Sequence, residues 1–85
     1  MTPTKTLEET VDLMLSSDAD DQFKAEYYQL ENRFITMSEM LLKWDLGRLD
    51  PTPPGDRFIY ANVVGIMRNY LDALKAEANV RGIVL

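Results

Sequence analysis

The sequence predicts an all-α fold in which a short N-terminal helix precedes an antiparallel two-helix coiled-coil hairpin. Two long stretches carry apolar residues at alternating spacings of four and three, which is the periodicity of a helical seam. A proline-rich segment separates these stretches, and proline cannot continue a helix. A chain of 85 residues has room for one domain with a thin core. We therefore treat residues 1–85 as a single helical domain.

The first helix is expected over residues 6–16. Thr6 and Glu9 have the spacing of a capping box, in which the Thr hydroxyl accepts from a first-turn N–H and the Glu side chain reaches back. A helix of about three turns is marginal alone, so it must dock, and it can cover one flank of the hairpin. Its apolar stripe comprises Leu7, Val11, Met14 and Leu15.

The second helix is expected over residues 20–46. Acidic residues supply capping acceptors and negative charge at its N-terminus, and Gly47 is placed to end it. A second apolar row beside its seam makes the apolar face wider than one partner helix covers. The acidic residues are Asp18, Asp20 and Asp21, the seam is Phe23, Tyr27, Leu30, Phe34, Met37, Leu41 and Trp44, and the second row is Tyr28, Ile35 and Leu42.

A connector over residues 50–56 leads into a third helix over residues 57–81. Asp56 can cap this helix, and Gly82 can end it. The third helix also has a seam and a second row beside it, so we expect it to be buried on two sides. The seam is Tyr60, Val64, Met67, Leu71, Leu74 and Ala78, and the second row is Ile59, Val63, Ile66, Tyr70 and Ala73.

The short connector makes the two long helices antiparallel neighbours. Matching their ends places Trp44 near Tyr60 and Phe23 near Arg81. The two widened seams leave more apolar surface than the short first helix can hide, so we expect a homo-oligomer.

Composition argues against several classes of partner. The net charge is −5, from 14 acidic and nine basic residues with no basic run, and duplex nucleic acid is held by clustered Lys and Arg. No apolar run approaches the roughly 20 residues that span a bilayer, and the N-terminus lacks a signal-peptide pattern. The absence of cysteine fits a reducing compartment. We expect a soluble cytoplasmic protein that binds neither a membrane nor duplex nucleic acid.

The residue types argue against an enzyme. Histidine and cysteine are both absent, which removes the commonest general base, the thiolate nucleophile and the soft metal ligands. The four glycines are isolated, so no phosphate-binding loop is present. The cluster of Asp18, Asp20 and Asp21 lacks the glycine and distal glutamate of a calcium loop and is interpreted as a helix cap. We expect no catalytic residue, metal or cofactor.

A candidate binding site for a small anionic ligand gathers aromatic and basic side chains towards the open end of the hairpin. A base could stack on tyrosine while Lys and Arg meet phosphates, in a pocket built between copies. The alternative is that the tyrosines are core residues and the charges are solvated flanks of the seams. The candidates are Lys24, Tyr27, Tyr28, Arg33, Tyr70 and Arg81.

Two segments carry a resemblance to a known family. They are residues 23–30, FKAEYYQL, with Arg33 following, and residues 67–71, MRNYL, continued by Ala78, Arg81, Gly82 and Ile83. The chain resembles, over residues 8–85, a family of small phage and prophage proteins of gut and other Gram-positive bacteria, some related to crAss-like phage proteins. The resemblance implies a phage-encoded protein of the infected host cytoplasm and does not define an activity.

The architecture is similar to that of the anti-CBASS and anti-Thoeris sponge proteins, although their motifs are not matched. The leading hypothesis is a phage inhibitor of bacterial antiviral defence that sequesters a cyclic nucleotide or ADP-ribose-type signal. The alternatives are a protein-binding inhibitor of a defence effector, similar to an anti-CRISPR, and a structural or assembly adaptor of the phage particle.

Overall fold

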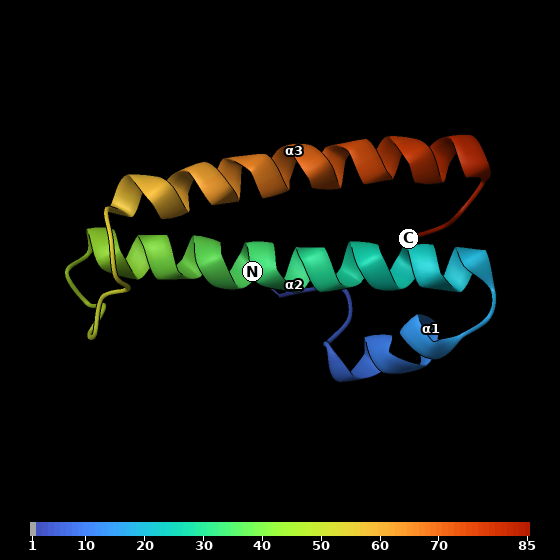
Figure 1. Cartoon of the computed structure of the whole chain (residues 1–85), viewed down its shortest axis with the longest axis horizontal. Helices are drawn as coiled ribbons and strands as arrows, with labels where there is room; N and C mark the ends of the chain where they lie inside the picture. Colours follow the sequence, from blue (N-terminus) through green and yellow to red (C-terminus); the bar gives the residue numbers. More distant parts are fainter. Residues whose placement is uncertain (1) are drawn as a thin grey trace.

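The computed structural model describes residues 2–85, and its regular elements within that range are all helices (Figure 1). A 3-10 turn η1 (Glu8–Thr10) leads into α1 (Val11–Leu15), followed by α2 (Ala19–Asp45) and α3 (Arg57–Arg81). The helices α2 and α3 run antiparallel and side by side, and α1 lies on the other side of α2. This arrangement confirms the predicted hairpin with a short N-terminal helix.

The helix ends form where local chemistry predicts them. A carboxylate oxygen of Asp18 accepts from the N–H of Asp20 at 2.9 Å, and that of Asp56 accepts from the N–H of Phe58 at 3.0 Å. Gly47 and Gly82 follow α2 and α3 with φ of 68° and 70°, in the left-handed region that glycine enters at least cost. Asp18 and Asp56 therefore act as N-terminal caps.

The predicted capping box is also present. The N–H of Glu9 donates to Thr6 Oγ1 at 3.2 Å, and the N–H of Thr6 donates to Glu9 Oε1 at 3.1 Å. The backbone hydrogen bond from Thr6 holds the pKa of the Glu9 carboxyl below its usual value of 4.5. The helix that follows is shorter than expected, because it begins as a 3-10 turn and ends at Leu15.

The core lies between α2 and α3. It is closed at the connector end by Trp44 against Tyr60, with ring centroids 5.9 Å apart, and at the open end by the Arg81 guanidinium 4.9 Å above the Phe23 ring. Both end contacts confirm the predicted register of the hairpin. The buried residues that pack together in this core are Phe23, Tyr27, Tyr28, Leu71, Leu74 and Ala78.

The docking side of α1 differs from the prediction. Thr10 is fully buried and Leu13 packs against the core. The Thr10 hydroxyl donates to the carbonyl of Leu7 at 2.6 Å and accepts from Gln29 Nε2 at 3.2 Å, so burial leaves its polar group satisfied. The expected apolar stripe does not enter the core: Leu7, Val11, Met14 and Leu15 are 56%, 42%, 48% and 74% exposed.

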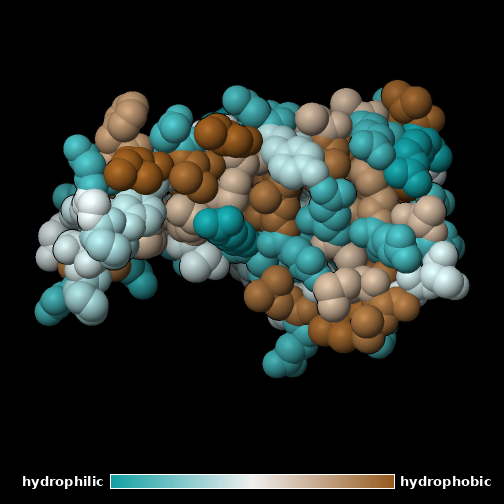
Figure 2. Space-filling view, in the orientation of Figure 1, coloured by the Kyte–Doolittle hydropathy of each residue, from teal (hydrophilic) through white to brown (hydrophobic). Residues whose placement is uncertain are grey.

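Large apolar side chains are also exposed on α3. Phe58, Ile59, Ile66 and Val80 are each more than half exposed. Figure 2 shows a row of hydrophobic side chains over the first half of α3, and a second group along the outer side of α1. The prediction that α3 would be buried on two sides is therefore wrong within this chain, and oligomerisation remains a prediction.

Replacing Leu71 with alanine tests the hairpin core. Leu71 is 7% exposed, so we expect Leu71→Ala to lower the free energy of unfolding by about 2 to 5 kcal/mol. Chemical denaturation would measure it. Val84→Ala, at a site 84% exposed, is the control and should change stability by less than about 0.5 kcal/mol. Equal denaturation midpoints for both variants would contradict the packing described above.

Candidate functional site

The structure does not bring the six predicted ligand contacts into one cavity. Tyr27 and Tyr28 are 4% and 3% exposed and belong to the core. Their rings meet edge to face, with centroids 5.6 Å apart and an interplanar angle of 82°. Neither ring has a free face on which a base could stack in this conformation, so their geometry agrees with the alternative of core residues.

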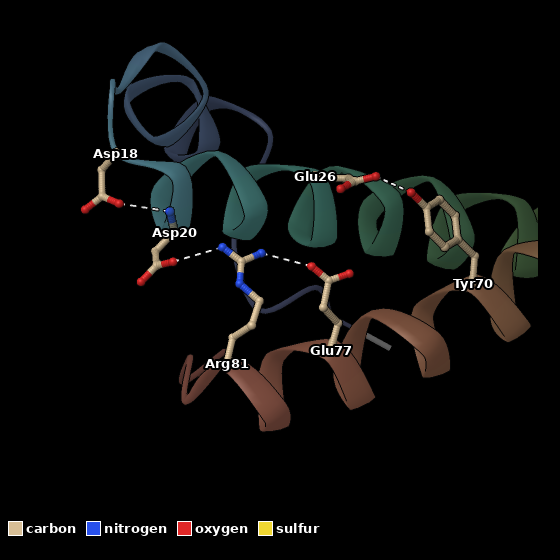
Figure 3. Close-up of polar contacts among 6 residues, drawn as sticks. All are labelled: Asp18, Asp20, Glu26, Tyr70, Glu77 and Arg81. Carbon is tan, nitrogen blue, oxygen red and sulfur yellow. Dashed lines mark hydrogen bonds and ion pairs between the residues drawn. The ribbon is translucent and has the colours of Figure 1, made fainter.

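Arg81 is occupied by contacts within the chain (Figure 3). Its guanidinium pairs with Asp20 at 3.0 Å and with Glu77 at 2.9 Å, and it also lies over the Phe23 ring. The contacts with Asp20 and Phe23 tie the end of α3 to the start of α2, whereas Glu77 lies on α3 itself and orients the guanidinium. Asp20 lies next to the Asp18 cap in the same view. Arg81 therefore serves as a clamp at the open end of the hairpin.

Tyr70 forms a cross-helix hydrogen bond. Its hydroxyl donates to the Glu26 carboxylate on α2, as Figure 3 shows. This hydrogen bond, together with the negative charge of Glu26, raises the pKa of Tyr70 above its usual value of 10.0. The ring itself remains 45% exposed, so Tyr70 offers a partly open aromatic surface on α3.

Lys24 and Arg33 cannot act on one ligand from the same helix. Nine residues separate them, which at 100° per residue places them on opposite sides of α2. Arg33 is exposed, forms no ion pair with any described residue, and borders an open hollow of about 370 Å³ beside Leu7. The rest of that hollow is lined by Gln29, Asn32 and Thr36, so no second cation meets Arg33 there.

The feature that the sequence analysis missed is the outward apolar face of η1 and α1, formed by Leu7, Val11, Met14 and Leu15. We call it the outer α1 face. The acidic side chains of Glu8 and Asp12 lie beside it in the sequence and are exposed. A second side of the same helix, less apolar than the first, docks instead. Thr10 and Leu13 are three residues apart on that side; Thr10 is fully buried and Leu13 packs against the core.

Neither metal binding nor a membrane span finds support in residues 2–85. Over this range no group of three or more acidic, histidine or cysteine side chains is arranged to hold a metal ion. No helix within the same residues is long and apolar enough to cross a bilayer. Comparison with known proteins gives no further guide, because no family model, curated protein or solved structure matches the chain.

The contrast between Arg81 and Arg33 gives a stability test. Arg81→Ala removes two ion pairs and a cation–π contact on partly exposed groups, so we expect unfolding free energy to fall by about 1 kcal/mol. Arg33→Ala, which removes no pairing, should change it by less than about 0.5 kcal/mol. Thermal unfolding of both variants in one buffer measures the difference. Equal losses would contradict the clamp at the open end.

The hydrogen bond between Tyr70 and Glu26 gives a pH test. A folded-state pKa raised above that of the unfolded chain means that the bond stabilises the fold below pH 10, and that this contribution is lost as pH rises through the raised pKa. Alkaline titration of the tyrosine ring resonances by NMR should show Tyr70 ionising above pH 10. In Glu26→Gln the value should move back towards 10. An unchanged Tyr70 titration in that variant would refute the interaction.

Proposed function

We propose that the chain is a non-enzymatic binding protein that docks on a partner protein through the outer α1 face. The observation that carries this proposal is the orientation of α1. A short amphipathic helix in a small domain ordinarily turns its apolar side to the core, whereas here four large apolar side chains are 42% to 74% exposed. Leu7 and Met14 lie at the α2 edge of this face, where Leu7 borders the hollow and Met14 Sδ accepts from Gln29, and Leu15 is its most exposed member. Within α1, Val11, Met14 and Leu15 have the i, i+3, i+4 spacing of the anchors of a helix that binds in a groove.

The proposed partner carries an apolar groove bordered by basic side chains. Glu8 and Asp12 flank the apolar anchors, and the whole chain has a net charge of −5. A basic rim on the partner would meet these carboxylates, and the long-range attraction would increase the association rate. Protein interfaces usually have apolar side chains at the centre and polar or charged side chains around them.

The resemblance to phage proteins suggests which partner to seek. A phage-encoded protein that binds without catalysis would act in the cytoplasm of the infected bacterium, as an inhibitor of an antiviral defence effector. Sequestration of a cyclic nucleotide or ADP-ribose-type signal stays a prediction. The geometry favours it less, because Tyr27 and Tyr28 are buried, Arg81 is paired, and Lys24 and Arg33 point to opposite sides of α2.

The test is a phage challenge of bacteria that carry one defence system at a time and express this chain. With the wild-type chain, phage titre should recover against at least one system. Leu15→Lys places a cation at a site 74% exposed, where it would repel a basic rim without disturbing the core. We expect this variant to bind the purified effector at least about tenfold more weakly, as loss of an interface anchor does, and to lose the rescue.

The matched control is Val84→Lys, which makes the same change of charge at a site 84% exposed on the C-terminal tail. It should retain both binding and rescue. Full rescue by Leu15→Lys would refute the outer α1 face as the docking surface. Calorimetric titration with cyclic nucleotides and ADP-ribose derivatives decides the sequestration hypothesis separately, because saturable heat with one of them, unchanged in Leu15→Lys, would replace the present proposal.

A further inference from the structure

A second heptad stripe follows α3 on a side that α2 does not cover. Its members are spaced three and four apart over the whole helix, and every one of them is exposed. We call it the outer α3 stripe. It comprises Ile59, Ile66, Ala73 and Val80 at one heptad position and Asn62, Asn69 and Ala76 at the other.

The stripe is free of charge. The chain carries 23 charged residues, from 14 acidic and nine basic, yet none of the seven stripe positions is charged. A solvated helix face normally concentrates charge, whereas coiled-coil seams exclude it and tolerate an occasional asparagine that fixes register. The composition is that of a helix–helix interface, and no described element of the chain covers it.

Gly65 lies beside the stripe and points to the same conclusion. Glycine in a helix interior is unfavourable, and Gly65 is not among the glycines with positive φ. A Cβ built on Gly65 would meet nothing within 4 Å in this chain, so internal packing does not require glycine either. Close approach of another helix at this point gives the missing reason for it.

We infer that the outer α3 stripe is the interface with a second copy of this chain, with the two α3 helices antiparallel. Side-chain size favours this orientation. The large residues Ile59 and Ile66 occupy the first half of the stripe, and Ala73 and Ala76 occupy the second half. An antiparallel copy places Ile59 against Ala76, so that bulky side chains pack on small ones along the interface.

The helix dipoles favour the same orientation, whereas the side-chain charges do not separate the two. Asp72 and Glu77 flank the stripe on opposite sides at positions that face each other in a parallel pair, where two such pairs would repel. In the antiparallel pair Asp72 lies opposite Gly65, and Glu77 lies near Asp56 of the other copy at the end of the interface, so each orientation holds two like-charge pairs. The opposed helix dipoles favour the antiparallel pair. The interface is independent of the proposed function, because it uses a different helix from the outer α1 face.

Sedimentation velocity over a concentration series tests the interface. The wild-type chain should form a reversible dimer, and Ile66→Lys should raise its dissociation constant by about 100-fold or more, since it removes a large apolar side chain from the centre of the interface and puts an unpaired charge there in both copies. Leu15→Lys is the control and should leave the dimer unchanged. Circular dichroism confirms that each variant is folded. A wild-type chain that stays monomeric, or an Ile66→Lys chain that dimerises as the wild type does, overturns the inference.

Engineered cysteines test the orientation, since the natural chain has none. In the antiparallel pair centred near residue 67, Asn69 and its copy are about 5 Å apart along the axis, whereas Asn62 and its copy are about 16 Å apart. A short bifunctional thiol reagent should therefore link Asn69→Cys chains and leave Asn62→Cys chains unlinked. Equal linking at both positions would show a parallel pair and overturn the proposed arrangement.

If the dimer fails but Leu15→Lys still abolishes effector binding, only the interface is wrong. If the dimer is confirmed but Leu15→Lys retains binding, only the outer α1 face is wrong. The two proposals therefore fail separately, because Ile66→Lys and Leu15→Lys act on helices that pack on different sides of α2.

Discussion

The packing of α2 against α3 is the constraint on which the rest of the structure depends. It is fixed at one end by Trp44 against Tyr60 and at the other by Arg81 over Phe23, so neither helix can slide along the other without breaking an end contact. The remaining elements are too short to fold alone and use this hairpin as their support. The C-terminal tail, η1 and α1 all lie against surfaces that the hairpin presents, with Leu13, Ile83 and Leu85 packed on its core.

The sequence predicts the hairpin well because its signals are local and repeated. Seam spacing, capping acceptors and glycines each act within a few residues. Because they agree along both long helices, they indicate a single alignment of the second helix against the third. The orientation of α1 could not be predicted in the same way. Periodicity shows which residues share a face, and it does not show which of two faces docks. Thr10 was a poor candidate for full burial by residue type, and only its two hydrogen bonds, to Leu7 and from Gln29, make that burial favourable.

The candidate ligand site was predicted from residue types, and residue types alone do not fix direction on a helix. Tyr27 and Tyr28 are adjacent in sequence and both reach the core, one towards α3 and one beside the N-terminal segment, where Lys5 lies 5.6 Å from the Tyr28 ring centroid. Arg81 was predicted near Phe23, and at that place its guanidinium forms ion pairs with Asp20 and Glu77. It is therefore not available to a phosphate group. The outer α1 face became visible only after the hairpin had been assembled, whereas uncovered apolar surface on the long helices was expected from their second apolar rows.

The positions of the outer α1 face and the outer α3 stripe have a consequence for binding. The helix α1 packs on one side of α2 and α3 on the other, so a second copy on the outer α3 stripe leaves the outer α1 face free. A dimer would then carry two identical docking faces held at a fixed separation. Binding of one face raises the effective concentration of the other, so an oligomeric effector with two grooves at a matching separation would be held much more tightly than a monomeric one. A domain with little core of its own would in this way gain stability and affinity from the same apolar residues that its short chain cannot bury.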